Sequence, residues 1–312
     1  MASCYPRSEN PDLGHPEIYG EFASHRSGPP ANSQDGEVGY DSFMRTVHTD
    51  DWLTLLACGV LAFIVADVSH EAVGHGLATL AVGGKVDFIT TCYVDSSGHY
   101  SKWIPAAGGL TNLAVGLGSL AFLRLRSHVS PMVLYFLILV AAFNLFFAVG
   151  YPAYSGIALF GDWAAVIHDL NPPWIWRVVL VAIAVGGYYV SMRLLIDPMA
   201  PFAGVAEHKA ERVSAQARIR RITLIPYIGS MVVACAAAAL NPRGPMQILT
   251  SGLPAAAAAF GLTQMDNLIS PRHAPASGGP LKPLQRSVPW IVAAVIVLTC
   301  FVLVLGRGLR FS

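Results

Sequence analysis

Residues 52–76 read WLTLLACGVLAFIVADVSHEAVGHG, and this stretch decides the fold. Its first part is a long apolar run, and its second part places Asp67, His70, Glu71 and His75 close together. Ionisable groups inside a membrane helix are costly, and their default interpretation is functional. The stretch therefore predicts a membrane-spanning helix that carries a polar site near its middle.

The whole chain has the composition of a membrane protein. Of its 312 residues, 54% are hydrophobic and 12% are charged, and the mean hydropathy is +0.51. Apolar runs that can cross a hydrocarbon core of about 30 Å lie at 52–82, 104–124, 131–150, 174–195, 222–240 and 289–306. Two further stretches, 155–168 and 245–265, are short or interrupted by glycine and proline. We therefore expect an all-α polytopic membrane protein with six to eight transmembrane helices.

Charge and cysteine content exclude several other classes of protein. The formal net charge is +1, and Lys and Arg do not cluster outside the loops, so we expect no nucleic-acid partner. The five cysteines are scattered and show no paired spacing of the kind that binds metals. The lipid bilayer is the expected environment of the chain.

The chain divides into three predicted parts. Residues 1–50 are rich in Pro, Gly and Ser without an apolar period, which predicts a disordered polar tail. Residues 51–170 hold the polar site, and residues 171–312 add further transmembrane helices with a basic loop at 196–221. Because Lys and Arg favour cytoplasmic loops, their placement predicts an integral protein of the cell membrane with a cytoplasmic N-terminus.

The connection between the first two spans has a different character. Residues 85–103 contain β-branched and aromatic residues around the turn signal Asp95-Ser-Ser-Gly98, which predicts a short β-hairpin. An extended edge there could receive a peptide by strand addition, or the segment could be an ordinary connecting loop.

The polar stretch resembles a zinc-binding helix with one residue too many. In the H-E-x-x-H pattern, histidines four residues apart bind zinc and the glutamate acts as general base. Here His70 and His75 are five residues apart, which on a regular α-helix separates them by about 140°. That separation is too large for both side chains to bind one ion easily.

Three local arrangements would restore a metal site. A π-bulge in the Ala72–Gly74 turn would absorb the extra residue, and unwinding at Gly74 would have a similar effect. Alternatively, Asp67, Glu71 and His75 follow one another at i,i+4 on a regular helix and would form a carboxylate-rich site. Without a metal, the histidines would instead hydrogen-bond to neighbouring helices.

The chain resembles the site-2 protease family of intramembrane zinc metallopeptidases in three places that follow the family's order. These places are His70-Glu71 with Gly74-His75, then Gly108-Gly-Leu-Thr-Asn112, then Asn144 with Tyr151-Pro152, Ser155-Gly156 and Gly161-Asp162-Trp163. They resemble the family's His-Glu-x-Gly-His helix, its Gly-Pro-x-x-Asn motif and its segment leading to Asp-Gly. This chain has an inserted residue in the first motif, glycine for proline in the second, and Gly-Asp in place of Asp-Gly in the third. The similarity covers about residues 52–168.

The resemblance implies a role for each residue. His70, His75 and Asp162 would bind Zn²⁺, and the catalytic residues would be Glu71, as general base, and Asn112, which would hydrogen-bond the substrate backbone or the oxyanion. Small and polar residues such as Asn112 also serve close helix packing in membranes, and this alternative stays open.

Three functions follow in order of preference. The first is a metalloprotease, a membrane-embedded hydrolase that cleaves a peptide bond in or near a transmembrane segment of a membrane protein or peptide substrate. The second is a catalytically inactive relative that binds or regulates a partner. The third is an ion-coupled transporter that uses the intramembrane His, Glu and Asp groups, although the sequence shows no internal repeat.

Overall fold

A computed structural model describes residues 49–126, 129–204, 209–269 and 280–311. The predicted disordered tail, residues 1–50, therefore lies outside the described residues except for its last two positions. The described residues belong to one compact unit.

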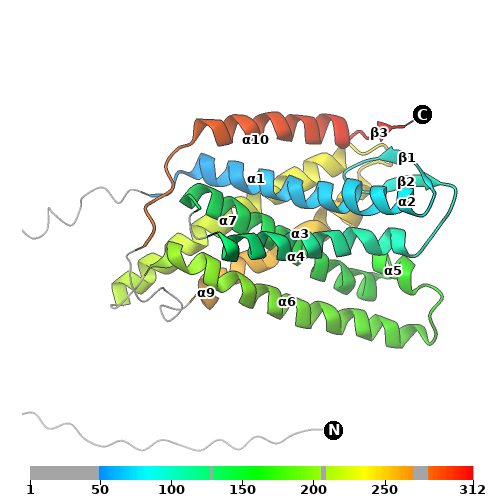
Figure 1. Ribbon diagram of the computed structural model, residues 1–312, viewed down its shortest axis with the longest axis horizontal. Helices are drawn as coiled ribbons and strands as arrows, with labels where there is room; N and C mark the ends of the chain where they lie inside the picture. Colours follow the sequence, from blue (N-terminus) through cyan, green and yellow to red (C-terminus); the bar gives the residue numbers. More distant parts are fainter. Residues whose placement is uncertain (1–48, 127–128, 205–208, 270–279, 312) are drawn as a thin grey trace, which may run out of the picture. The chain divides into compact units, whose positions relative to one another are not determined.

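Six helices of the described chain are long and apolar enough to cross a membrane, which indicates an integral membrane protein. These candidate spans are Trp52–Ala81, Trp103–Leu125, Pro131–Ala158, Pro173–Ala203, Glu211–Ala239 and Val288–Leu305. They correspond to the six long apolar runs of the sequence. Figure 1 shows that their helices run side by side, with a small sheet at one end of the bundle.

The first candidate span contains three consecutive elements. They are helix α1 (Trp52–Val68), a π-helical segment η1 (Ser69–Gly76) and helix α2 (Leu77–Ala81). Asp51 caps α1, because its Oδ1 accepts hydrogen bonds from the backbone N–H and the hydroxyl of Thr54, at 3.0 and 2.9 Å. The cap satisfies an N–H group that no helical carbonyl can reach.

The remaining elements complete the bundle. They are α3 (Trp103–Leu125), α4 (Pro131–Ala158), α5 (Asp162–Ile167), α6 (Pro173–Ala203), α7 (Lys209–Ala239), η2 (Ile248–Gly252), α8 (Leu253–Ala258), η3 (Ala259–Gln264), α9 (Met265–Leu268), α10 (Val288–Cys300) and η5 (Phe301–Leu305). The two uncertain stretches of the sequence, 155–168 and 245–265, contain only short or irregular helices beyond the end of α4. Neither is a candidate span in the described chain.

Helix α4 lies at the centre of the bundle, since it is the most buried of the six candidate spans. The ring of Phe63 in α1 meets the rings of Phe143, Phe147 and Phe301 edge to face, at 6.0–6.1 Å between centroids. Such aromatic contacts hold α1, α4 and η5 in a fixed arrangement. The polar segment η1 is therefore attached to a rigid apolar core.

The prediction of a basic loop at 196–221 is wrong for most of that range. Helix α6 continues to Ala203 and α7 begins at Lys209, so most of the predicted loop is helical. Arg218 donates to both carboxylate oxygens of Asp50, at 2.9 and 3.0 Å, and Asp50 is buried. The cluster of basic residues suggested a solvent-exposed loop. Arg218 is instead mostly buried, because it pairs with a carboxylate 168 positions away in the sequence, and such a contact leaves no local pattern.

The predicted hairpin between the first two spans is present, but its turn lies elsewhere. Strand β1 (Lys85–Ile89) pairs antiparallel with β2 (Val94–Ser97), and Asp95 lies within β2 and not in the turn. The Thr90 hydroxyl makes the turn, because it accepts from the backbone N–H groups of Cys92 and Tyr93, both at 3.1 Å.

A third strand, β3 (Leu309–Arg310), pairs with the other edge of β1, so the order in the sheet is β2-β1-β3. The sheet lies at the α2 end of the first span (Figure 1). The end of the chain therefore occupies one of the two strand edges that the hairpin alone would leave open.

Candidate metal centre

The π-helical segment η1 accommodates the extra residue of the histidine motif. It spans Ser69–Gly76, longer than the bulge predicted at Ala72–Gly74. In a π-helix the backbone hydrogen bonds run from i to i+5, so residues five apart lie about one turn apart. The rings of His70 and His75 accordingly lie in contact, edge to face, with 4.8 Å between centroids and 86° between planes.

Each histidine is fixed by a hydrogen bond at one ring nitrogen. Nδ1 of His70 lies 2.6 Å from Oδ1 of Asn112, and Nδ1 of His75 lies 2.7 Å from the carbonyl oxygen of Ile104. Because both partners are acceptors, each Nδ1 carries the proton and donates it. With Nδ1 as the donor, Nε2 of each ring is the nitrogen that can present a lone pair to an ion, as a metal-binding histidine requires.

Asp162 reaches both Nε2 atoms from a distant part of the chain. Its Oδ2 lies 2.9 Å from Nε2 of His70 and 3.5 Å from Nε2 of His75. The chain arrives there after α4 ends, through Leu159 and Gly161, whose φ angles of 56° and 86° are left-handed. Gly161 adopts this conformation without the steric cost that a side chain brings.

The electrostatics of Asp162 suit a ligand role. Burial by itself would raise the pKa of the Asp162 carboxyl, but the charges of His75 and His70 and their hydrogen bonds outweigh burial and hold the pKa well below its usual range. Asp162 is therefore a carboxylate that faces two imidazole nitrogens.

Glu71 is the second carboxyl group at the centre. Like both histidines it is buried, and the ligand atoms of His70, Glu71 and His75 lie within 4.8 Å of one another, so this group can hold a metal ion. Oε2 of Glu71 has no hydrogen-bond partner among the described residues. A buried polar atom without a partner is costly and calls for a water molecule or ion beside it.

Glycines of the second motif give the histidines their space. A β-carbon at Gly108 would lie 2.7 Å from Nε2 of both histidines, and one at Gly74 would lie 2.6 Å from Cα of Gly108. Helix α3 therefore approaches η1 closely only because both positions are glycine. The next residue, Gly109, gives space to the indole of Trp163, whose Nε1 would lie 3.2 Å from a β-carbon there.

The role predicted for Asn112, a hydrogen bond to the substrate or the oxyanion, is corrected by its contacts. Asn112 is 0% exposed. Its Nδ2 donates to the carbonyl oxygen of Ala66 at 2.8 Å and to Oδ1 of Asn144 at 2.9 Å, while its Oδ1 accepts from His70. Both N–H groups of the amide are used, so no donor is left for a substrate. Asn112 instead orients His70, and Asn144 orients Asn112.

Two residues at the centre had no role in the sequence-based prediction. The ring of Tyr151 stacks on His70, with 4.9 Å between centroids and 29° between planes. The other residue is Ile104, which contributes a backbone carbonyl. The pair Tyr151-Pro152 belongs to the third motif, but only the folded chain shows which ring it faces, and a backbone acceptor leaves no sequence signal.

Other candidates lie apart from the centre. Asp67, which would be a ligand on a regular helix, instead lines a separate small cavity with Cys92 and Ser251. Asp169, the next acidic residue after Asp162 in the sequence, pairs with His168 and Lys102 at an exposed position. The carboxylate-rich alternative is therefore not the arrangement adopted.

The geometry fits a tetrahedral ion such as Zn²⁺. Ligand atoms about 2.0–2.2 Å from a tetrahedral zinc ion lie about 3.3–3.6 Å apart. The separations between the Nε2 atoms and Oδ2 of Asp162, 2.9 and 3.5 Å, need only a small opening to match. Two imidazoles and a carboxylate are also a ligand set that zinc uses.

Comparison with protein-family models, curated proteins and solved structures finds no match for this chain. The class of this protein is therefore defined only by its fold and by the candidate metal centre. It is a helical protein with six candidate membrane spans and a buried His70, Glu71 and His75 group that can hold a metal ion.

Proposed function

We propose that the protein is an intramembrane zinc metallopeptidase of the site-2 protease type, which hydrolyses a peptide bond in or near a transmembrane segment of another protein. The observation that carries this proposal is the convergence of two imidazole nitrogens and the Asp162 carboxylate beside an unpartnered Glu71 oxygen. This arrangement supports the roles that the resemblance implies for these four residues.

The two carboxyl groups have different tasks in this proposal. Asp162 is the third ligand, because its Oδ2 already contacts Nε2 of His70 and lies near Nε2 of His75. Glu71 is the general base, because its Oε2 is free to accept a proton. When bound, Zn²⁺ supplies Lewis acidity and lowers the pKa of water to about 7.

The chain's own residues perform the proton transfers. Glu71 accepts a proton from the attacking water and returns it to the leaving amine, which completes hydrolysis without a net change in the enzyme. Asn112 and the carbonyl of Ile104 keep Nε2 of each histidine directed at the ion. The surrounding apolar helices limit access to bulk water, so the substrate is a peptide that reaches the site within the bilayer.

The first test is metal analysis of the full-length protein purified in detergent. We expect about one zinc per chain in the wild type and its loss in His70→Ala, His75→Ala and Asp162→Ala. The matched control is His168→Ala, since His168 is exposed and contacts Asp169 and not the centre. A wild-type protein without metal, or equal metal in all variants, would contradict the proposal.

The second test separates a protease from an inactive metal-binding relative. Glu71→Gln keeps the shape of the side chain and removes its basicity, so we expect it to retain zinc and to lose cleavage of labelled single-span membrane peptides. Cleavage is measured by mass spectrometry of the new termini. Zinc in the wild type with no cleavage of any peptide would support the binding or regulatory alternative.

A further inference from the structure

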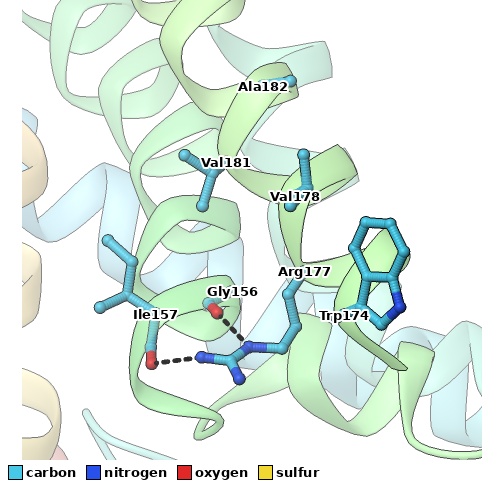
Figure 2. A pocket seen from close by; sticks show the side chains of 7 residues that line it. All are labelled: Gly156, Ile157, Trp174, Arg177, Val178, Val181 and Ala182. Carbon is cyan, nitrogen blue, oxygen red and sulfur yellow. Dashed lines mark hydrogen bonds between the residues drawn. The ribbon is translucent and has the colours of Figure 1, made fainter. Parts of the chain in front are cut away.

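A groove of about 480 Å³ opens between the end of α4 and the first turns of α6. Neither His70 nor His75 lines it. Its lining is apolar apart from one arginine, Arg177 (Figure 2). The apolar part consists mainly of Ile157, Trp174, Val178, Val181 and Ala182. The hydrolysis proposed above uses none of these residues.

Arg177 carries a positive charge that no carboxylate of the described residues compensates. Its Nε donates to the carbonyl oxygen of Gly156 at 2.8 Å and its Nη2 to that of Ile157 at 3.2 Å, as Figure 2 shows. Among the described residues no carboxylate pairs with it, and no hydrogen bond of its Nη1 is found. The two carbonyls hold the guanidinium in place but bring no negative charge, so an anion beside it would be attracted electrostatically.

The position of the groove indicates where that anion comes from. Trp174 lies in the first turn of a candidate span and is 65% exposed, as expected for an aromatic residue at the membrane interface. Arg177 follows one turn deeper. Val178, Val181 and Ala182 continue inward, and positions 174–182 cover about 12 Å of helix. In a membrane that this candidate span crosses, the groove would thus lead from the head-group level into the hydrocarbon region.

We propose that this groove binds a phospholipid, with its phosphate on Arg177 and one acyl chain against Val178, Val181 and Ala182. Arginine is well suited to phosphate, because its fork of N–H groups matches two phosphate oxygens. A transmembrane helix of a partner fits less well. At a diameter of about 10 Å and a rise of 1.5 Å, a helix fills about 120 Å³ per residue, so the groove would hold only about four residues.

The bound lipid would also act on the end of α4. Arg177 holds the carbonyls of Gly156 and Ile157, and the chain turns from there through Gly161 toward Asp162. A phosphate that fixes Arg177 would therefore stabilise the segment that carries Asp162. The lipid site itself does not depend on the proposed hydrolysis, because it needs only insertion into a membrane.

Native mass spectrometry of the full-length protein, titrated with phosphatidylglycerol in detergent, tests the proposal. We expect one lipid to bind more tightly than the rest and Arg177→Gln to weaken it by about tenfold or more, as loss of a charged hydrogen bond predicts. The matched control is Arg193→Gln, on the same helix about 24 Å away, which should leave this affinity unchanged. Equal lipid affinity in all three proteins overturns the proposal.

A second variant covers the case in which Arg177→Gln loosens α4. Ala182 is exposed in the groove, so Ala182→Trp fills the acyl-chain position and leaves the hydrogen bonds of Arg177 intact. We expect it to weaken lipid binding by a similar factor. Unchanged binding in Ala182→Trp overturns the acyl-chain assignment, and so does displacement of the lipid by inorganic phosphate alone. Crosslinking of a protein helix at position 182, in place of lipid, would show the other kind of occupant.

Discussion

Two polar features near the end of α4, the histidine centre and Arg177, differ in the partners that surround them. On the inner side, His70 and His75 are buried, and each has a fixed partner at Nδ1 and a carboxylate near Nε2. On the outer side, Arg177 has carbonyl partners but no carboxylate in the described chain, and its groove opens outward. The inner site is preorganised by the protein, whereas the outer one depends on what the surroundings supply.

The contrast shows how function can be recognised from unpaired groups. Polar atoms that meet a partner inside the protein define geometry, as Asn112 and Asn144 do. A buried atom that lacks one among the described residues, such as Oε2 of Glu71, marks the place of something that these residues do not provide. Changes at the inner site should therefore alter metal binding directly, whereas changes at the outer groove should act first on lipid binding.

The largest effect is expected for Gly108→Ala. Its β-carbon would lie 2.7 Å from Nε2 of both histidines, where the ion belongs, so metal affinity should fall by more than about 100-fold. Gly118→Ala on the same helix is the control, because no atom lies within 4 Å of a β-carbon there. Metal content is measured after dialysis against a weak chelator. One zinc per chain in Gly108→Ala would mean that the ion lies elsewhere.

A smaller effect is expected for Asn112→Leu, which removes the partner of Nδ1 of His70. Loss of such an outer hydrogen bond lowers metal affinity by about 10–100-fold, and the buried atoms left unpaired lower stability by about 1–3 kcal/mol. Competition with a fluorescent zinc chelator gives the affinity, and thermal unfolding gives the stability. Asn144→Leu should lower stability but change metal affinity less, since Asn144 does not touch His70. Equal losses of affinity would argue against a specific role for Asn112.

Tyr151 should contribute to the inner site through its ring. Tyr151→Leu removes the ring that stacks on His70, and a stacked pair stabilises by about 0.5–1.5 kcal/mol, so metal affinity should fall by up to about tenfold. Tyr151→Phe keeps the ring and should bind metal nearly as the wild type does. The same chelator competition measures both variants. If Phe loses as much affinity as Leu, the hydroxyl and not the ring is what matters.

The smallest effect is expected from a chain that ends at Leu305 and so lacks β3. This strand pairs with β1 at Phe88 and Ile89, and the backbone N–H of Phe311 donates to the carbonyl oxygen of Asp87. These few hydrogen bonds contribute about 0.5–1.5 kcal/mol each. Metal content should stay at the wild-type level, with a slightly lower unfolding temperature in detergent. Loss of metal on this truncation would show that the sheet helps to hold the inner site.

Local patterns determined much of this protein. The length of each apolar run requires a helix near the length of a membrane span, and the six runs became six candidate spans. The polar stretch after Asp67 identified His70, Glu71 and His75 because ionisable groups inside an apolar helix are costly wherever the rest of the chain lies. Their misfit to a regular α-helix also made a π-bulge one of three possible local arrangements, and η1 is π-helical.

Tertiary structure decided what depends on distant partners. Asp162 meets His70 across 92 residues, and its pairing could be inferred only by resemblance to a family. The amide of Asn112 turned out to be fully used by His70, Ala66 and Asn144, because burial obliges every polar group to find a partner. Likewise, Arg218 and β3 were outside the reach of local patterns, since an ion pair or a strand edge is completed by whichever segment the fold brings alongside.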